Sequence, residues 1–461
     1  MARATSRRFA ARRSNRTWQA AALVAAGALT AAGCSSSSSS GSTGSTAPVS
    51  GGSSSAPGNA TSGTINWWAS PINTSGTDVR QVLIKDFEAQ YPNIKVTLTS
   101  APTNTDTNRA ALATDISGGA ATPDVFMGDV IWPAQFGAHQ LAVPLSDYLP
   151  TSYFAQFAPG LVQGASYQGK VYGSPLFEDQ GFLYYRKDLL AKENLPVPTT
   201  WEQLESEAEQ LQKAGLVKYG FVWEGASYEG LTCNYMEYLA DAGGTATNSS
   251  YTSASLDSAA SVKAVTFMRS LITSGVSPAA TSTFQQDQAM STFASGQAAF
   301  LRNWDYAYAD SQVKGTPTVG KVGVAPMPTF QGQSAPGYSN IGGWNLYINP
   351  HSKNIAADLT FIKFMASTQA QDVLAEQYSE IPTVESVRTS PAVLAKNPVL
   401  ATVPKTKLVP RPAGTPNYPQ LSTAIYTNLN AALAGSVSPS AAMSSAQSQA
   451  NTALSSSAGG L

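Results

Sequence analysis

Residues 64–127 alternate between short apolar runs and helical patterns, and this alternation restricts the possible folds more than any other feature of the chain. Three runs have the length and composition of strands: Thr64–Ala69, Ile94–Leu98 and Val125–Met127. Apolar residues recur at helical spacing after Asp78, which suits a helix cap, and a second helix is expected over Thr107–Ile116. Strands separated by helices pair in parallel, so the chain is predicted to be an α/β protein with functional loops at the strand ends.

A second strand–helix unit is expected to begin at Gly181–Tyr185. Further strands are expected at Tyr219–Trp223 and Ala298–Arg302. Helices are predicted over Trp201–Ala214, Tyr228–Ala242, Ser258–Ser274, Phe284–Gly296, Ala356–Ala366, Thr368–Tyr378 and much of Tyr418–Leu461. The chain after residue 63 has about 400 residues, which is more than one ordinary core accommodates, so two lobes are expected.

The N-terminal residues have the pattern of an export signal. Six arginines and no acidic residue accompany the apolar run Ala20–Ala32, and Gly33, Cys34 and a run of serines follow it. The apolar run is shorter than the about 20 residues that a membrane-spanning helix needs. A cysteine directly after a small residue resembles a bacterial lipoprotein signal, which implies that Cys34 becomes an acylated N-terminus. An ordinary secretory signal with an incidental cysteine is the alternative.

Residues 34–63 combine the predicted lipidated cysteine with a linker that is almost wholly Ser, Gly, Thr, Ala, Pro and Asn and carries no charge. Such a composition is typical of a flexible coil, with a root-mean-square reach of about 30 Å. The sequence therefore predicts a globular body that is lipid-anchored to the outer face of the cytoplasmic membrane.

The charge balance and the cysteine count exclude several classes of function. Residues 1–33 hold six of the 28 basic residues and none of the 29 acidic ones, so the remaining chain has a net charge of −7. This balance argues against nucleic acid as a partner, because nucleic acid attracts basic surfaces. Apart from Cys34, Cys233 is the only cysteine, and His139 and His351 lie far apart. We therefore expect no metal, no cofactor and no disulfide.

Seven segments along the chain resemble one protein family in the same order. They are FEAQYPNIKV at Phe87–Val96, PDVF at Pro123–Phe126, VYGSP at Val171–Pro175, LYYRKDLL at Leu183–Leu190, PTTWEQL at Pro198–Leu204, RNW at Arg302–Trp304 and GGW at Gly342–Trp344. The family is that of the extracellular sugar-binding proteins of ABC importers, which includes maltose-binding protein. The resemblance covers about residues 64–430, and the trehalose- and maltose-binding branch is the most similar.

This resemblance implies the two-lobed periplasmic-binding-protein type II fold, with a ligand cleft and hinge crossings. Carried onto this chain, one lobe comprises residues 64–176 and 304–366, and the other comprises residues 177–303 and 367–461. It also implies a monomer that binds a disaccharide between its lobes and delivers it to the membrane subunits of an ABC permease.

A sugar-binding cleft needs aromatic rings that stack on the C–H faces of the sugar and polar groups that pair with its hydroxyls. Trp304 follows the strand expected at Ala298–Arg302, and we favour it as a stacking platform over a core residue, with Asp305 directly after it. Trp344 follows two glycines that let the backbone approach a ligand, although the same glycines could simply permit a turn.

Several carboxylates are predicted to lie at strand ends, where they could accept hydrogen bonds from hydroxyls. Asp129 ends the third strand, with Trp132 just beyond it, and the alternative role for Asp129 is to cap a helix. Glu178 and Asp179 lie at the first lobe crossing, where they are either hinge acceptors or solvated loop charges.

The last candidates flank helix starts. Trp223 closes a strand, and Glu229 is either a sugar acceptor or a first-turn charge that favours the helix dipole. Arg411 lies between two prolines, and Tyr418 follows seven residues later. A stiff loop would hold the guanidinium in place for hydroxyls, whereas a surface arginine is the alternative.

Two other functions remain open at this point. A lipid-anchored glycoside hydrolase could use a carboxylate pair such as Asp129 and Glu229, separated by about 5–9.5 Å, as acid and base. A structural or adhesive lipoprotein would need no aromatic cleft. The chain lacks the G-x-x-x-x-G-K, G-x-S-x-G and H-E-x-x-H motifs. A binding protein that makes and breaks no bond is the leading hypothesis.

Overall fold

The computed structural model describes residues 60–74 and 76–456. The predicted signal, Cys34 and most of the linker lie outside the described residues. Within the described part, no helix has both the length and the apolar character that a bilayer span requires. All described residues belong to one unit of the chain, residues 55–461.

A larger mixed sheet is built from segments that lie far apart in the sequence. Its strand order is β12 (Ile381–Pro382), β6 (Ser174–Gln180), β11 (Tyr338–Ile348), β3 (Val125–Asp129), β1 (Gly63–Ala69) and β2 (Ile94–Ser100), and β13 (Lys407–Val409) pairs with β11. The strands β2, β1 and β3 are parallel, as the sequence predicts, whereas β11 runs antiparallel to both β3 and β6.

Helices pack on this sheet through the apolar positions that the sequence pattern indicates. They include α1 (Val79–Gln90), α2 (Thr105–Ser117), α12 (Ile355–Met365) and α13 (Thr368–Tyr378). Asp78 caps α1 by accepting a hydrogen bond from the backbone N of Arg80 at 3.0 Å. Phe87 of α1 contacts Phe361 of α12 with ring centres 5.0 Å apart, and Trp67 of β1 contacts the same ring at 5.2 Å. These contacts join sheet and helices into one core.

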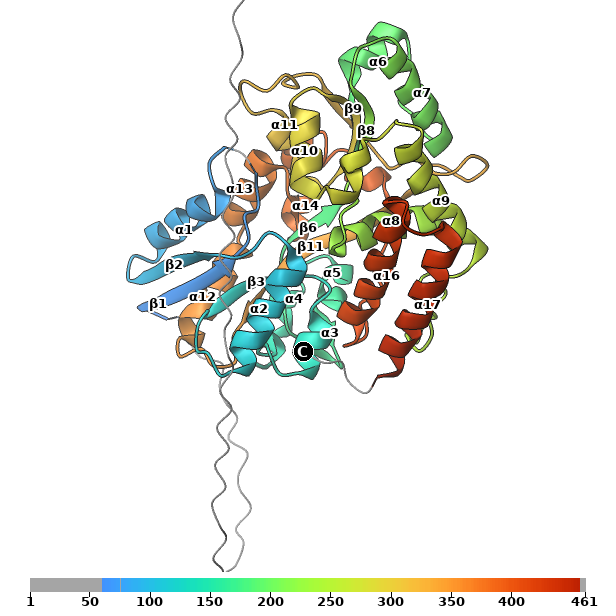
Figure 1. Cartoon of the computed structure of the whole chain (residues 1–461). Coiled ribbons are helices and arrows are strands. Elements are labelled where there is room, and N and C mark those ends of the chain that lie inside the picture. Colours follow the sequence, from blue (N-terminus) through green and yellow to red (C-terminus); the bar gives the residue numbers. More distant parts are fainter. Residues whose placement is uncertain (1–59, 75, 457–461) are drawn as a thin grey trace, which may run out of the picture. The chain divides into compact units, whose positions relative to one another are not determined.

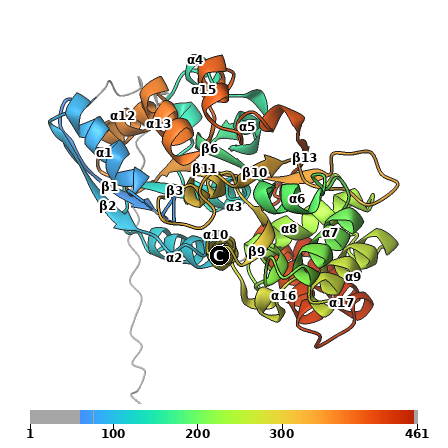
Figure 2. The same cartoon turned by 90° about the horizontal axis from the view of Figure 1, so that it is seen from above.

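A smaller sheet forms a second core. Its strand order is β10 (Val322–Ala325), β7 (Phe182–Arg186), β9 (Ala298–Asn303) and β8 (Tyr219–Val222). The helices around it are α6 (Lys187–Glu193), α7 (Trp201–Lys213), α8 (Glu229–Asp241), α9 (Ala259–Thr273), α10 (Gln286–Ala294), α11 (Ala307–Ser311), α16 (Tyr418–Leu433) and α17 (Pro439–Ser455). Figures 1 and 2 both show α16 and α17 side by side next to α9. All the helices predicted from the sequence in this region are confirmed.

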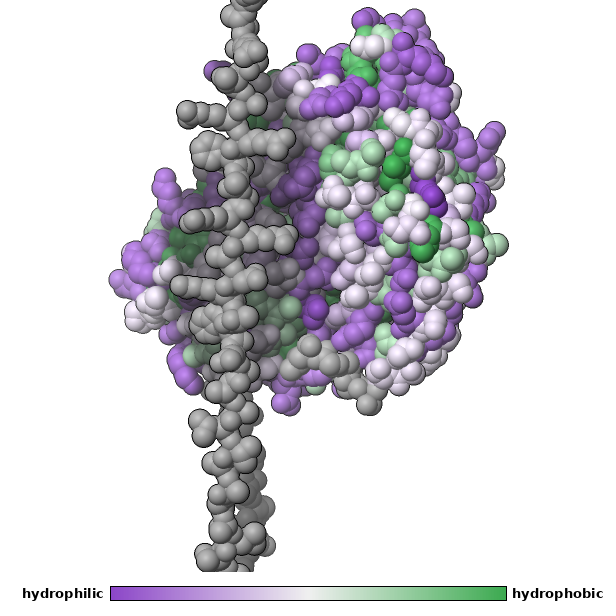
Figure 3. All heavy atoms as spheres, in the orientation of Figure 1, coloured by the Kyte–Doolittle hydropathy of each residue, from purple (hydrophilic) through white to green (hydrophobic). Residues whose placement is uncertain are grey.

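Short elements complete the described part of the chain. They are α3 (Pro133–Ala138), α4 (Thr151–Phe154), α5 (Pro159–Gly164), α14 (Glu385–Arg388), α15 (Pro391–Lys396) and the hairpin of β4 (Ser166–Tyr167) with β5 (Lys170–Val171). On the face shown in Figure 3, hydrophobic residues form small separate groups among hydrophilic and pale ones. In the described ranges, the large hydrophobic residues that are exposed are Val319, Leu408 and Val437.

The chain passes from one sheet to the other at Gly181, which separates β6 from β7. A Cβ atom at Gly181 would lie 2.1 Å from Oε1 of Glu237 and 2.7 Å from Nη2 of Arg302, so only glycine fits there. The lobe boundaries that the resemblance implies stay a prediction. Three segments, however, pair across them: β10 lies in the smaller sheet, and β12 and β13 lie in the larger one.

Asp358 on α12 gives a first testable prediction. Its Oδ2 accepts a hydrogen bond from Ser352 at 2.6 Å, whereas its buried Oδ1 has no hydrogen-bond partner among the described residues. Burial raises the pKa of Asp358 from 3.8 to about 7. A pKa that is higher in the folded state stabilises the fold below about pH 4, and this contribution is lost as the pH rises to about 7. The melting temperature of the wild type should therefore fall as the pH rises over this range. We expect this fall to be smaller by several degrees in Asp358→Asn.

The matched control is Asp115→Asn, because Asp115 lies exposed on α2. Melting temperatures of the three proteins between about pH 4 and 8 test the prediction. If Asp358→Asn follows the wild-type curve throughout, then Asp358 is not the group that couples stability to pH.

Candidate functional site

A cavity lies between the two sheets, next to the carboxyl ends of β3 and β9 and the start of α8. Its free space, including the open solvent at its mouth, is about 710 Å³. The aromatic residues along it are Phe177, Tyr228, Trp304, Tyr306 and Trp344. The charged residues along it are Asp129, Asp179, Glu229, Glu380 and Arg411.

Trp304 is both a wall of this cavity and part of a core. Its side chain is only 7% exposed, and the Arg302 guanidinium lies 4.1 Å from the centre of its ring. Tyr184 fixes the backbone there by donating a hydrogen bond to the Trp304 carbonyl at 2.6 Å. The two alternatives weighed from the sequence, a stacking platform and a core residue, therefore do not exclude each other.

Trp344 reaches the cavity from the middle of β11, where it is paired with Asp129 of β3. Trp132 packs against it edge to face at 6.3 Å and is itself buried beneath Phe136. The glycine before Trp344 does not make a turn. Gly343 has a φ of +120°, beside a register shift in the strand, and a Cβ atom there would lie 2.6 Å from the Phe177 carbonyl oxygen.

Arg411 joins two carboxylates that come from opposite sides of the cavity. Its Nη2 lies 2.8 Å from Oδ1 of Asp129 at the end of β3, and its Nη1 lies 2.9 Å from Oε1 of Glu229 on α8. The Arg411 side chain is only 2% exposed. The guanidinium and the two carboxylates supply donors and acceptors for hydroxyl groups. Because both carboxylates bind the same guanidinium, neither is without a partner.

Glu229 is held by further contacts at the start of α8. Ser422 donates a hydrogen bond to its Oε2 at 2.6 Å, and the Tyr418 hydroxyl donates to its Oε1. Asp106 of α2 accepts a hydrogen bond from the backbone N of Glu229 at 3.0 Å. Burial raises the pKa of Glu229 to about 7 despite the opposing effect of Arg411, and Asp106 adds to the rise.

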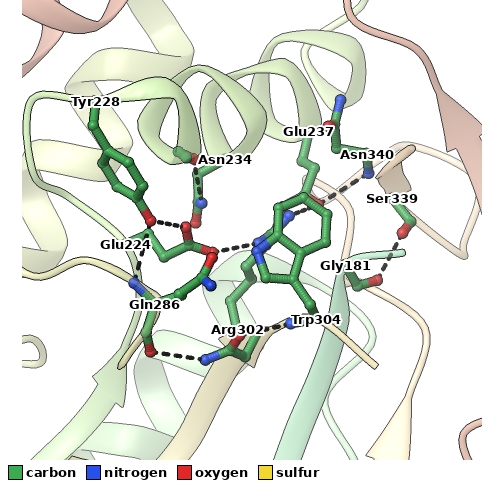
Figure 4. A network of polar contacts seen from close by, with 12 residues as sticks. Gly181, Glu224, Tyr228, Asn234, Glu237, Gln286, Arg302, Trp304, Ser339 and Asn340 are labelled. Carbon is green, nitrogen blue, oxygen red and sulfur yellow. Dashed lines mark hydrogen bonds and ion pairs between the residues drawn. The ribbon is translucent and has the colours of Figure 1, made fainter. Parts of the chain in front are cut away.

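A buried ion-pair network supports the cavity wall behind Trp304 (Figure 4). Arg302 lies 2.8 Å from Oε1 of Glu224 and 2.6 Å from Oε1 of Glu237, and all three side chains are 1% exposed or less. Glu237 also accepts a hydrogen bond from the backbone N of Asn340 at 3.0 Å, which links α8 to β11. Burial alone would lower the pKa of Arg302, but Glu237 and Glu224 raise it above its ordinary value.

A second group of carboxylates closes the inner end of the cavity. Asp179 and Glu380 line it, and Asp305 lies directly beside them. Ligand oxygens of the three residues are within 4.8 Å of one another. Burial raises the pKa of Asp179 to about 6, an effect that the charge of Glu178 increases.

The structure brings six of the predicted site residues to the cavity: Asp129, Asp179, Glu229, Trp304, Trp344 and Arg411. Five others do not line it: Trp132, Glu178, Trp223, Asp305 and Tyr418. Glu178 instead forms an ion pair with Arg388 at 2.5 Å, and the buried Trp223 donates a hydrogen bond to Ser277 at 3.0 Å. Asp305 and Tyr418 contact residues that do line the cavity. The binding role of each residue stays a prediction.

Sequence reasoning missed Glu380, Tyr228, Tyr306 and Gln286 on the cavity wall. Tyr228 directly precedes Glu229, so its position in the same turn was the available signal. Glu380 has no such signal, because it reaches the cavity only through the pairing of β12 with β6.

Comparison with known proteins identifies the family. The sequence profile of the family described as bacterial extracellular solute-binding protein matches residues 70–372. A probable ABC transporter-binding protein of Deinococcus radiodurans is 32% identical over 364 residues, which cover 77% of this chain and 85% of that relative.

Solved structures agree with this assignment. The maltose-bound MalE3 of T. maritima aligns with a TM-score of 0.79 at 31% identity, over 85% of this chain and 100% of that one. The GacH receptor of Streptomyces glaucescens, solved unliganded and in complex with acarbose, aligns with a TM-score of 0.74 at 27% identity, over 85% and 98%. The fold is therefore the two-lobed one of solute-binding proteins, which the sequence predicted, and it does not support the glycoside hydrolase alternative. The chain belongs to the bacterial extracellular solute-binding proteins, and its relatives are binding proteins of ABC transporters rather than enzymes.

Proposed function

We propose that this protein binds a disaccharide of the maltose or trehalose type and delivers it to the membrane subunits of an ABC importer. One observation carries the proposal: the Trp304 and Trp344 side chains share a cavity with the ion pairs of Arg411. Aromatic rings suit the C–H faces of a neutral sugar, and the bidentate carboxylate–guanidinium pair suits its hydroxyls. The maltose bound to the T. maritima relative supports the same ligand class.

Binding is expected to act through closure of the lobes. Asp129 belongs to the larger sheet, whereas Glu229 starts α8, which an ion pair between Glu237 and Arg302 joins to β9 of the smaller sheet. A ligand that contacts both groups binds the closed form better than the open one. A closed form that binds about 100-fold more tightly is favoured by about 2.7 kcal/mol. No bond in the ligand needs to break.

We further propose that Cys34 carries a lipid and that the linker holds the body near the outer face of the cytoplasmic membrane. The extracellular family supports export of the chain. The lipoprotein-like signal before Cys34 supports the anchor. Metabolic labelling with a radioactive fatty acid tests it, because Cys34→Ala should abolish the label while leaving the protein exported.

Calorimetric titration of the purified protein with trehalose, maltose and their monosaccharides tests the ligand class. We expect saturable binding of at least one disaccharide, and no release of product when a chromogenic glucoside is added. Release of product would contradict a pure binding function. Absence of binding across a broad panel of sugars would contradict the sugar itself.

Trp344 provides the matching mutational test. We expect Trp344→Ala to weaken sugar binding by about tenfold or more, because an aromatic ring against an apolar ligand face contributes about 1.5–3 kcal/mol. The control is Trp68→Ala, since Trp68 is also half-buried on the larger sheet but does not line the cavity and donates its hydrogen bond to Asn108. Equal losses of affinity in the two variants would show that Trp344 acts only through folding.

A further inference from the structure

Three carboxylates from distant parts of the chain meet at the inner end of the cavity. Asp179 belongs to β6, Asp305 follows β9, and Glu380 precedes β12. Antiparallel pairing of Ile381 with Glu178 places Glu380 beside Asp179. Asp305 joins them by accepting a hydrogen bond from the backbone N of Ile381 at 2.8 Å. The cluster is therefore built by strand pairing and not by a flexible loop.

The cluster lacks partners that would neutralise it. Glu380 is fully buried, and in the described part of the chain no donor other than the neighbouring carboxyl of Asp179 reaches its carboxylate oxygens. The fully buried Oδ1 of Asp305 likewise has no hydrogen-bond donor in the described part of the chain other than the carboxyl of Asp179. The neighbouring arginines are bound elsewhere, Arg388 to Glu178 and Arg411 to Asp129 and Glu229. A group of buried carboxylates without a counter-charge is strongly unfavourable.

We propose that Asp179, Asp305 and Glu380 form a binding site for a divalent cation, of which Ca²⁺ fits best. Ca²⁺ binds oxygen ligands at about 2.3–2.6 Å, so two ligands of one ion are at most about 5 Å apart. The ligand oxygens of the cluster meet this condition, since all lie within 4.8 Å of one another. An all-carboxylate cluster favours Ca²⁺ over Mg²⁺, because Mg²⁺ is usually held by only one or two carboxylates and retains several waters.

The cavity offers the ion both a route and the remaining ligands. Asp179 and Glu380 line the cavity, so an ion can enter from its mouth, whereas Asp305 holds it from behind. Water or ligand hydroxyls on the cavity side can complete the six to eight oxygens that Ca²⁺ prefers. No sequence pattern indicated this site, because its three acids lie more than 70 residues apart and the group includes no histidine or cysteine.

Titration of the full-length protein with CaCl₂ after treatment with EDTA tests the proposal. We expect one Ca²⁺ to bind per chain and to raise the melting temperature. Terbium should bind at the same place and emit when tryptophan is excited, because Trp304 is adjacent to Asp305, and Ca²⁺ should displace it. No heat of binding and no sensitised terbium emission would overturn the proposal.

Variants assign the site to these residues. Glu380→Gln and Asp305→Asn should each reduce Ca²⁺ affinity by about tenfold or more, because each removes one charged ligand. The control Asp358→Asn removes a buried carboxylate elsewhere on the larger sheet and should leave Ca²⁺ affinity unchanged. Equal effects of all three substitutions would overturn the assignment, and circular dichroism verifies that each variant is folded.

Two further measurements separate a metal ion from the alternatives. The first is to compare the binding of glucosamine and glucose in EDTA. If glucosamine binds and glucose does not, if Glu380→Gln abolishes this binding, and if Ca²⁺ does not bind, then the cluster holds an ammonium group and the metal site is overturned. The second is the Ca²⁺ titration itself: if no cation binds and the three acids share protons instead, the metal site is overturned as well. Sugar binding that persists in EDTA while Ca²⁺ fails to bind would overturn only this inference and leave the proposed function intact.

Discussion

Replacing Arg302 with Met is expected to lower the free energy of unfolding by about 3–5 kcal/mol, which is a large part of the stability of an ordinary domain. The substitution leaves Glu224 and Glu237, both fully buried, without the guanidinium that neutralises them. It also removes the cation beneath the Trp304 ring. Urea denaturation followed by circular dichroism measures the loss as a lower transition midpoint.

The control for Arg302 is an ion pair of the same kind at the surface. Lys213 pairs with Glu209 at 3.0 Å on α7, and the Lys213 side chain is 77% exposed. Lys213→Met should change the stability by less than about 1 kcal/mol, because exposed pairs contribute little. Adding Glu224→Gln and Glu237→Gln to Arg302→Met should recover part of the loss. Similar midpoints for Arg302→Met and Lys213→Met would contradict the buried network as a source of stability.

Replacing Arg411 with Met is expected to weaken ligand binding by about 100-fold, which corresponds to about 2.7 kcal/mol. Without the guanidinium, Asp129 and Glu229 are left buried and unneutralised on opposite sides of the cavity. Their repulsion opposes the closed form as well as the ligand. Arg411→Lys should recover little affinity, because an ammonium group cannot make the bidentate contact with Asp129. Calorimetric titration with the sugar that the wild type binds measures both effects.

Arg388 is the matched control for Arg411. It also forms an ion pair with a buried carboxylate, Glu178, but this pair lies outside the cavity lining. Arg388→Met should therefore lower the stability while leaving the dissociation constant for the sugar within about threefold of wild type. Equal losses of affinity in Arg388→Met and Arg411→Met would mean that Arg411 acts through folding rather than through the cavity.

The elements of the fold were predictable where the pattern is local. Apolar residues at helical spacing indicated α1, α7 and α9, and short apolar runs between them indicated β1, β2 and β3. The cap at Asp78 followed from the same local rules. The crossings between the sheets came from the family resemblance, because no local pattern encodes them.

The candidate site was predictable only in part, because its geometry depends on strand register. Glu178 and Asp179 are adjacent in the sequence and equally acidic, yet alternate residues of a strand face opposite sides. Asp179 therefore points to the cavity while Glu178 pairs with Arg388. Trp223 also looked suitable, but its indole N–H is satisfied by Ser277 within the core. Strand position suggests candidates, and long-range pairing selects among them.

The contact between Arg302 and the Trp304 ring has a consequence for affinity. An aromatic side chain that moves freely before binding loses conformational entropy when a ligand fixes it, at a cost of about 0.5–1.5 kcal/mol. The Trp304 ring is already immobilised by Arg302 and by the buried backbone around it. This ring is thus ordered when the protein folds. A ligand that stacks on it gains the contact without having to offset the free energy of ordering the ring.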